Sequence, residues 1–338
     1  MAAGPPIEML ALVYEIGGSN TRAALVNTLT LEVLVEARSP TPNFHSHGKA
    51  GIDGLLQALA ATIRDLAESA RSGGQADLVA IGYPGPMSPD GIALSSPTLL
   101  GASLDRHLDI TDLVRRATGL RRVVAMNDVT ACGFRYVADG ETDFALINVG
   151  SGVGNKLFVR GNPVVGPGGR GGEFGHFTVD MRPDAPLCEC GGRGHLAGMS
   201  SGRGVERAVR QAAREDPAGF LGSALGADKG GRGLIDTPAI VGAFRGGDEW
   251  VIRHVAAATR PLAHAMAGLH TATGTESFIL VGGFALALGP AWRDLLAEQC
   301  AAACWNLGQN WHSMVRLGEP GDRDGLIGLA FAAGRDLA

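Results

Sequence analysis

The chain has 338 residues, 45% of them hydrophobic, so it can bury a large core and is long enough for two domains of ordinary size. Its formal charge is −5 and its charges are scattered, without the lysine or arginine runs that mark surfaces for nucleic acid or membrane, so we expect neither as a partner. Five cysteines, an odd number, favour a reducing compartment over a disulfide framework, and we expect a cytoplasmic protein.

Hydrophobic periodicity predicts an α/β chain whose first strands form a hairpin and a meander. The elements expected in this part are strands at 9–16, 20–27 and 31–40, a helix at 51–72, a strand at 77–83, a helix at 111–118, a strand at 121–128 and a helix from 129 to about 136. Residues 144–165 then repeat the opening design of apolar strand, glycine turn and second strand. Two such units with glycine and small hydroxylated residues are typical of a duplicated phosphate-binding fold.

The later part of the chain is more helical. We expect helices at 204–214, 237–246 and 249–269, a buried strand at 276–281 and a final helix at 325–336. The domain boundary is predicted near Met126. This divides the chain into a small N-terminal α/β domain at 1–125 and a larger α/β domain at 126–321, with a C-terminal helix at about 322–338 packing back on the first domain.

A glycine-rich stretch from Gly168 to His195 holds four residues of the kinds that bind zinc. His176, Cys188, Cys190 and His195 supply two imidazoles and two thiols, a set suited to a tetrahedral zinc site. The alternative is that the two cysteines are buried thiols without a metal. Because all four ligands would be protein side chains, such a zinc would be structural rather than catalytic.

Seven motifs in order, EIGGSNTR, GYPGP, NDVTACG, NVGSGVGN, GGRGGEFGH, CECGGRGH and VGGFA, resemble the ROK family of sugar kinases and repressors, within the actin-like ATPase superfamily. The resemblance covers nearly the whole chain. It implies a two-domain actin-like (ribonuclease H-like) α/β fold with an ATP cleft between the domains. It also implies ATP-dependent phosphorylation of a hydroxyl, a primary one by family analogy.

Three glycine turns would hold the nucleotide in a protein of this family. Their residues are Gly17, Gly18, Ser19 and Thr21 in the first phosphate loop, Gly150, Ser151 and Gly152 in the second, and Gly282 and Gly283 beside the adenosine. Taken one at a time, each can be only a tight hairpin turn. The family usually has aspartate where this chain has Glu15, which we expect to hold Mg²⁺ directly or through water.

Asp128 is the expected general base, because the resemblance places the base at this aspartate and phosphoryl transfer needs a carboxylate near the accepting hydroxyl. Asn127 beside it would hydrogen-bond to substrate hydroxyls. The pair can also be a helix N-cap after a strand, and both interpretations can hold together.

The resemblance also places Glu173 and His176 at the sugar. One ring nitrogen of His176 would bind the zinc while the other donates to a substrate oxygen, so the metal would orient the imidazole. The family has a third cysteine where this chain has His195.

Two departures from the family pattern bear on the substrate. Hexose kinases of the family carry glutamate where this chain has Ala197, and usually asparagine where it has Thr98, a further expected substrate contact. A pocket without that carboxylate should favour a ring with altered substituents. We therefore expect a hexose or a hexose-like cyclitol as substrate, with a C7-cyclitol of aminocyclitol metabolism as a specific alternative.

Two further alternatives are not kinases. A catalytically weak sugar-binding protein of the family is one of them. A repressor would carry a DNA-binding module ahead of Glu15, and about fourteen residues are too few for it. We also expect the protein to form a homodimer.

Overall fold

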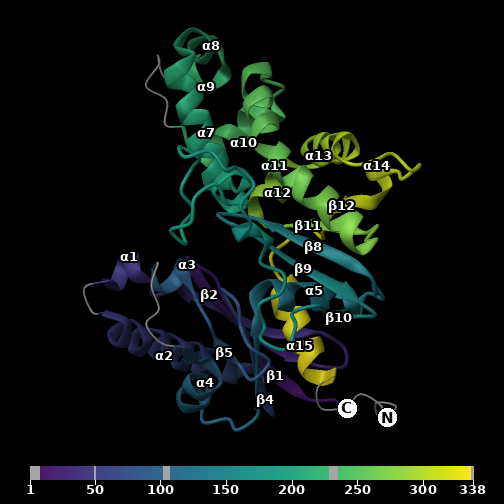
Figure 1. Ribbon diagram of the computed structural model, residues 1–338. Helices are drawn as coiled ribbons and strands as arrows, with labels where there is room; N and C mark the ends of the chain where they lie inside the picture. The colour runs from purple at the N-terminus through teal and green to yellow at the C-terminus, as the bar shows by residue number, and fades with distance from the viewer. Residues whose placement is uncertain (1–7, 49–50, 102–106, 228–234, 336–338) are drawn as a thin grey trace. The chain divides into compact units, whose positions relative to one another are not determined.

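The computed structural model describes residues 8–48, 51–101, 107–227 and 235–335 (Figure 1). The chain forms two compact units. The first comprises Met1–Thr142, Phe158–Gly172 and Gly321–Ala338, and the second comprises Asp143–Leu157 and Glu173–Pro320. Each unit is described by itself.

The first unit is built on a five-stranded sheet with the order β3-β2-β1-β4-β7. Its strands are β1 (Leu10–Ile16), β2 (Asn20–Asn27), β3 (Val33–Pro40), β4 (Leu78–Tyr83) and β7 (Val123–Asn127). The first three strands form the antiparallel meander that the sequence predicts, and β4 and β7 extend it in parallel with β1. The carboxyl ends of these parallel strands therefore meet at one edge of the sheet.

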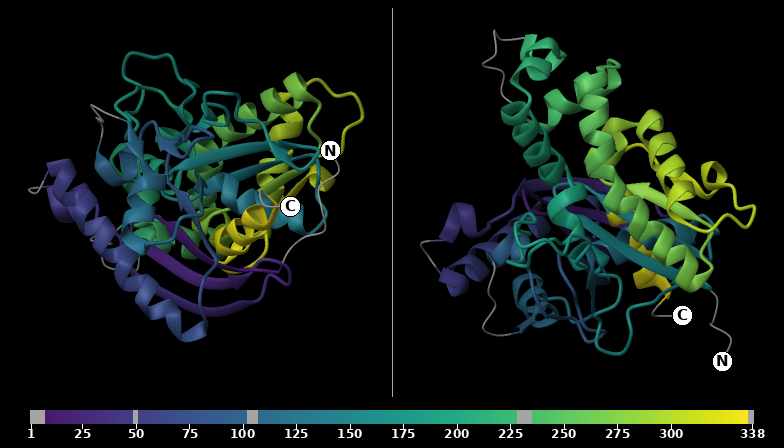
Figure 2. Two further views of the ribbon diagram at one scale, coloured as in Figure 1. Left: turned by 90° about the horizontal axis from the view of Figure 1, so that it is seen from below. Right: turned by 45° about the horizontal axis from the view of Figure 1, so that its top comes forward.

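Alternate residues of β1 bury opposite faces of this sheet, as the two-residue period of a strand requires. Leu12 and Tyr14 pack in a cluster with helices α2 (Gly51–Ala70) and α4 (Ile110–Thr118). Ala11 lies on the other face of the sheet. It packs in a cluster that includes residues of α5 (Asp128–Ala138) and α15 (Asp324–Arg335). Figure 2 shows α15, in yellow, on the opposite side of the purple strands from α2.

The C-terminal helix α15 belongs to the first unit. Tyr136 on α5 donates a hydrogen bond to the Asp324 carboxylate at the start of α15 (2.7 Å). The predicted boundary near Met126 differs from the structure, in which the first unit runs on to Thr142. The reason is that α5 packs on the sheet and on α15, so the strand and helix around Met126 belong to one core.

The second sheet has the order β10-β9-β8-β11-β12. Its strands are β8 (Phe144–Val149), β9 (Val153–Val159), β10 (Asn162–Pro163), β11 (Phe278–Val281) and β12 (Val315–Leu317). The long helix α11 (Glu249–Thr273) lies in the main core of the second unit. The helices that share this core include α7 (Gly202–Glu215), α10 (Thr237–Arg245) and α13 (Pro290–Ala303).

The remaining elements are short. They are α1 (Phe44–His47), η2 (Arg71–Gly73), β5 (Ile92–Ala93), α3 (Pro97–Leu100), β6 (Leu108–Asp109), η3 (Phe174–His176), α6 (Leu196–Ser200), α8 (Pro217–Gly222), α9 (Ala224–Ala227), α12 (Gly283–Leu288) and α14 (Trp311–Met314). The α/β class and the long predicted elements are confirmed. The expected final helix ends at Arg335, and its predicted last residue lies outside the described part of the chain.

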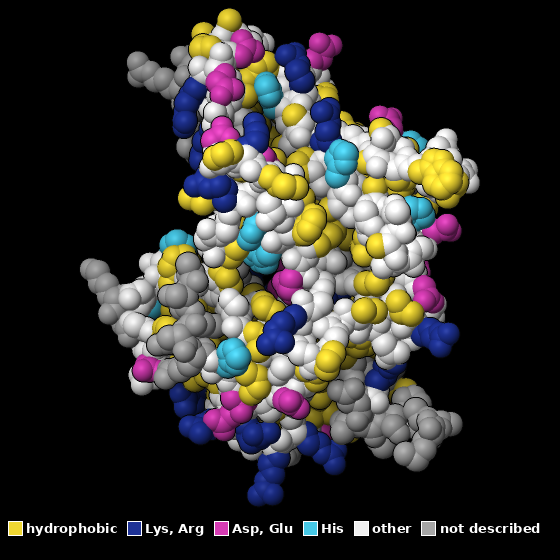
Figure 3. All heavy atoms as spheres, in the orientation of Figure 1, with side chains coloured by type: hydrophobic (Ala, Val, Ile, Leu, Met, Phe, Trp, Pro, Cys, Tyr) yellow, Lys and Arg dark blue, Asp and Glu magenta, His cyan; other side chains and the backbone are white. Residues whose placement is uncertain are grey.

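Charged side chains of both signs are interspersed on the face shown in Figure 3, in agreement with the scattered charges of the sequence. Among the described residues, no helix is both long enough and apolar enough to cross a membrane.

Candidate active site and metal centre

The first glycine turn joins β1 to β2 at the carboxyl end of β1. The Gly17 N–H donates to the Asn20 carbonyl oxygen (3.0 Å) and closes the turn. Neither Gly17 nor Gly18 has a positive φ, so a special backbone angle is not what selects glycine here. A Cβ on Gly18 would lie 2.6 Å from Cγ2 of Thr98, so glycine lets α3 approach the turn. The expected phosphate loop and the expected substrate residue Thr98 are therefore neighbours within the first unit.

The hydroxyl residues of this turn differ in exposure. Ser19 is exposed, whereas Thr21 is fully buried and its hydroxyl shares a hydrogen bond with that of Thr41 (2.9 Å). Thr41 also donates its N–H to the Ser19 carbonyl oxygen (2.9 Å). Thr21 therefore stabilises the turn through a buried hydrogen bond, while Ser19 lies at the surface of the turn.

Glu15, the expected magnesium residue, pairs with Arg22 on the neighbouring strand. The two residues lie opposite each other in the β1–β2 ladder, and Nη2 of Arg22 is 2.7 Å from Oε2 of Glu15. Burial raises the pKa of Glu15 above its usual value, and the Arg22 guanidinium opposes this shift. Arg22 also contacts the Asp322 carboxylate (2.7 Å). Any cation at Glu15 thus competes with an arginine already in place.

Asp128 lies at the carboxyl end of β7 and opens helix α5. Its Oδ1 accepts hydrogen bonds from the Val129 N–H and from the Asn127 side-chain amide (both 2.9 Å). These two donors fix the plane of the carboxylate. A carboxylate held in a fixed position at a strand end is suited to accept a proton from a substrate hydroxyl.

Asn127 is the N-cap of α5, which confirms the capping interpretation of this residue pair. Its Oδ1 accepts from the N–H groups of Val129 and Thr130, and its Nδ2 donates to the Gly85 carbonyl oxygen and to Asp128. All of the polar atoms of this side chain are thus used within the protein. A direct contact between Asn127 and substrate stays a prediction.

The second glycine turn, at Gly150–Gly152, joins β8 to β9, and it meets two other segments of the second unit. The Gly202 N–H at the start of α7 donates to the Gly150 carbonyl oxygen (2.8 Å). Gly282 has a φ of +96°, and a Cβ there would overlap the carbonyl of Val149. The structure thus brings the second and third predicted nucleotide motifs together. It adds Gly202, which the sequence analysis missed and whose only signal was a Ser-Gly pair opening a helix.

The four predicted metal ligands converge in the second unit. Their nearest ligand atoms all lie within 4.8 Å of one another. Nδ1 of His176 is 3.7 Å from Sγ of Cys188, and Nδ1 of His195 is 3.2 Å from Sγ of Cys190. Zinc–sulfur and zinc–nitrogen bonds of ordinary length in a tetrahedron place such atoms about 3.6 Å apart. The donor set and its spacing therefore suit one tetrahedral metal ion.

Backbone hydrogen bonds hold these ligands in place. The Cys188 N–H donates to the Gly192 carbonyl oxygen (2.8 Å), which closes a tight turn through both cysteines. Leu196, the residue after His195, donates its N–H to the Phe177 carbonyl oxygen (3.0 Å), which ties the two histidine segments together. Burial and the neighbouring His176 lower the pKa of His195, which favours the neutral imidazole that a metal needs.

Glu173, which is predicted together with His176 to contact the substrate, begins the short turn that carries His176. The His176 N–H donates to the Glu173 carbonyl oxygen (3.0 Å). The Glu173 carboxylate forms an ion pair with Lys156 of β9, with 2.8 Å between Nζ of the lysine and Oε1 of the glutamate. The sequence analysis missed Lys156, because nothing near it in the chain marks Glu173 as its partner. Ala197 is part of α6, two residues after His195, the last of the predicted metal ligands.

The predicted site residues are thus divided between the two units. The first glycine turn, Thr98 and Asp128 lie in the first unit, and the second glycine turn, Gly282 and the Cys/His cluster lie in the second.

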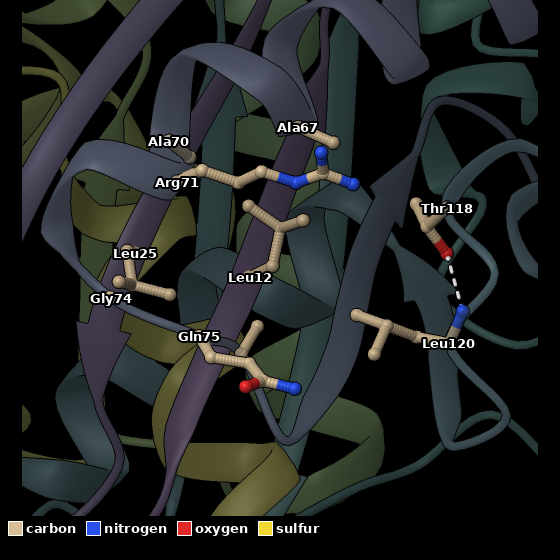
Figure 4. Close-up of a pocket in the computed structure, with 10 residues that line it drawn as sticks. Leu12, Leu25, Ala67, Ala70, Arg71, Gly74, Gln75, Thr118 and Leu120 are labelled. Atoms are coloured by element: carbon tan, nitrogen blue, oxygen red, sulfur yellow. Dashed lines mark hydrogen bonds between the residues drawn. The ribbon is translucent and has the colours of Figure 1, made fainter.

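A separate cavity of about 590 Å³ lies in the first unit (Figure 4). Its lining includes Leu12 near the amino end of β1, Arg71 after helix α2, and Leu120, whose N–H donates to the Thr118 hydroxyl (3.3 Å). None of the predicted site residues lines it. The cavity is therefore distinct from the candidate active-site residues.

Comparison with known proteins places these features in a family. Among curated proteins, the chain is 39% identical to a C(7)-cyclitol 7-kinase of Streptomyces hygroscopicus subsp. limoneus over 343 residues, which cover 100% of this chain and 97% of the relative. An N-acetylmannosamine kinase of Escherichia fergusonii is 28% identical, with 83% of this chain and 85% of that protein covered.

Solved structures agree with this comparison. A ROK family glucokinase from Streptomyces griseus, in complex with glucose and AMPPNP, is 25% identical with a TM-score of 0.72, and 97% of this chain and 99% of that chain are covered. A ROK hexokinase from Thermus thermophilus is 25% identical with a TM-score of 0.69, covering 98% of both chains. The predicted actin-like ATPase fold is confirmed by these neighbours. The sequence model of the ROK family matches residues 12–335, and this chain belongs to the ROK family.

Proposed function

We propose that this protein transfers the terminal phosphoryl group of ATP to a hydroxyl of a C7-cyclitol. The observation that carries the reaction type is Asp128, a carboxylate fixed by two hydrogen bonds at the carboxyl end of a parallel strand. The substrate class is supported by the full-length similarity to C(7)-cyclitol 7-kinases, at 39% identity. At the coarser level, the chain is an ATP-dependent kinase of a sugar or a cyclitol.

In this reaction the Asp128 carboxylate, held by Asn127 and the Val129 N–H, accepts the proton of the attacking hydroxyl. The lost proton leaves an alkoxide-like oxygen that attacks the γ-phosphorus, and the bond from that phosphorus to the bridging oxygen of ADP breaks. Little covalent chemistry is required of the protein, because alignment and charge neutralisation supply most of the catalysis.

The glycine turns are the proposed phosphate contacts. Backbone N–H groups and the exposed Ser19 and Ser151 are suited to hold phosphate oxygens, and Gly282 and Gly283 would lie by the adenosine. Glu15 is the proposed carboxylate for Mg²⁺, which when bound offsets the charge of the phosphates. Its ion pair with Arg22 keeps this carboxylate in a defined position.

The Cys/His cluster is the proposed site of a structural Zn²⁺, held by His176, Cys188, Cys190 and His195. Two thiolates and two imidazoles close a tetrahedron and leave no position for water, so the ion would supply stability rather than chemistry. Nδ1 of His176 faces the cluster, and the opposite ring nitrogen is then the one suited to donate to a substrate oxygen.

A hexose kinase is the second candidate, because the structural neighbours include a glucokinase in complex with glucose. Ala197 and Thr98 favour the cyclitol, since a side chain without a carboxylate leaves fewer acceptors for the hydroxyls of a glucose ring. A catalytically weak sugar-binding role, a cytoplasmic location and a homodimer stay predictions.

The test is a coupled assay of ADP release with Mg-ATP and a panel of neutral C7-cyclitols, hexoses and N-acetylhexosamines. We expect the highest kcat/KM with a C7-cyclitol. A higher kcat/KM with glucose than with any C7-cyclitol would show that the preferred substrate is a hexose. ADP release with no compound of the panel would refute the kinase activity.

A further inference from the structure

A buried lysine lies against the carboxylate that is expected to face the substrate. The Lys156 side chain on β9 is only 2% exposed, whereas the Glu173 side chain is 25% exposed. Nζ of Lys156 is 2.8 Å from Oε1 of Glu173. Solvent therefore reaches part of the glutamate but almost none of its cationic partner.

A buried ammonium group is costly, and it persists only where its partners offset the loss of water. For Lys156 this partner is the carboxylate of Glu173, which lies three residues before His176 in the chain. The neighbouring strand residue, Asn155, is also buried, and its Oδ1 accepts a hydrogen bond from the Phe174 N–H (3.0 Å). Two consecutive residues of β9 thus tie down the turn that carries Glu173 and His176.

This ion pair changes what Glu173 presents to a substrate. An unpaired carboxylate would attract an ammonium group of the substrate strongly, since the interaction of two opposite charges in a partly desolvated site is large. With Lys156 on Oε1, the negative charge is already balanced. The second oxygen remains a good hydrogen-bond acceptor, but the pair as a whole has no net charge that would select a cation.

We propose that Lys156 is a positioning and specificity-determining residue, which orients Glu173 to accept a hydrogen bond from a neutral substrate hydroxyl and disfavours an amine at that position. The substrate class is accordingly a cyclitol that carries hydroxyl groups there, rather than an aminocyclitol. This inference rests on the proposed kinase function and narrows its substrate.

The experiment compares a neutral C7-cyclitol with a set of analogues in which one ring hydroxyl at a time is replaced by a primary amine. kcat and KM are measured for the wild type, Lys156→Met and Glu173→Gln. Lys156→Met keeps an unbranched side chain that is one atom shorter and removes its charge, and Glu173→Gln removes the opposite charge. Zinc content and Tm report whether each variant is folded.

The two variants should change selectivity in opposite directions. For Lys156→Met we expect the KM of the neutral ring to rise about tenfold with kcat within about threefold, because binding rather than chemistry is affected. For one amine analogue, kcat/KM relative to the neutral ring should rise at least about tenfold, since the carboxylate is now unbalanced. For Glu173→Gln the same ratio should fall below the wild-type value, because an unbalanced ammonium remains.

A purely structural ion pair would lower Tm without moving this ratio. The assignment is overturned if a folded Lys156→Met enzyme keeps the wild-type KM and amine-to-neutral ratio. If Lys156→Met does not fold, the Glu173→Gln ratio decides, and an unchanged ratio overturns the assignment. Failure of the proposed function is distinct, because the wild type would then turn over none of the rings, and the assignment would fall with it.

Discussion

At the residue scale, the candidate site depends on carboxylates that neighbouring residues hold in position by hydrogen bonds or an ion pair. Asp128 is held by the same asparagine that caps α5, so the end of the strand, the start of the helix and the candidate base form one hydrogen-bonded unit. Glu15 is held by Arg22 across the β1–β2 ladder. In both cases the local backbone decides where a carboxylate oxygen points.

Replacing Asp128 with asparagine should lower kcat by about 10²–10⁴-fold, because a general base is lost while the shape is kept. The asparagine Oδ1 can still accept from the Val129 N–H, so the N-terminus of α5 should remain intact. Steady-state kinetics of the coupled assay and a thermal melt check both expectations. Undiminished turnover in Asp128→Asn would show that another group takes the proton.

Glu15 should set the acid limit of magnesium activation. Burial raises the pKa of Glu15, so as pH falls its carboxylate becomes protonated earlier than an ordinary glutamate and loses its affinity for Mg²⁺. The Mg²⁺ concentration for half-maximal activity should therefore rise as pH falls through this raised value. Glu15→Gln should need more Mg²⁺ at neutral pH and lose this pH dependence. An acid limb that is unchanged in Glu15→Gln would assign it to a different group.

At the element scale, the segment from Glu173 to His195 contains little regular structure, and its shape depends on turns and side chains. Within this segment only a short 3₁₀ turn, η3, is regular, and isolated bridges join Thr178 to His195 and Leu187 to Arg193. Because the segment has so little regular structure, an ion bound by the four side chains would contribute much of its local stability.

Cys188→Ser should therefore lose stoichiometric zinc and lower the apparent Tm by about 5–10 °C, as the loss of a few kcal/mol does in a chain of this size. Metal analysis of the purified protein and thermal melts measure both effects. Cys300→Ser is the matched control, since Cys300 is a buried cysteine of α13 outside the cluster and should keep its zinc. Stoichiometric zinc in Cys188→Ser would refute the ligand set.

The long elements and the clustering of two cysteines with two histidines were predictable from sequence, because both depend on spacing along the chain. Helix α2 has its buried residues at helical intervals, and Cys188 and Cys190 are separated by a single residue. The Lys156–Glu173 pair was not predictable, since its members are distant in sequence and nothing local marks them as partners. The same holds for Gly202, which meets Gly150 only in the folded unit.

At the scale of the whole molecule, the first unit is assembled from three separated stretches of chain. Its last stretch is α15, which packs on α5 so closely that a Cβ on Gly328 would overlap the Ala131 carbonyl oxygen. The C-terminal helix is thus part of the same core as the base-bearing helix. The stability of the candidate site depends on residues about 200 positions away along the chain, as the Tyr136–Asp324 hydrogen bond shows with a separation of 188.

Gly328→Ala should destabilise the protein by about 1–3 kcal/mol, because the added methyl group forces two packed helices apart. Gly268→Ala is the control. Gly268 is an exposed glycine of α11 with open space around it, where alanine should stabilise the helix by about 0.5–1 kcal/mol. Denaturant melts of both variants measure the difference. Equal stabilities would mean that α15 does not pack tightly on α5.

The α/β class, the order of the main strands and helices, the family resemblance and the candidate metal-binding cluster could all be inferred from the sequence alone. These follow from periodicity and from motifs whose residues are close together in the chain. The tertiary structure decided which unit each segment joins, and it placed Arg22 on Glu15, Gly202 at Gly150 and Lys156 on Glu173. Those contacts arise from strand register and from packing between distant segments, and local sequence does not encode either one directly.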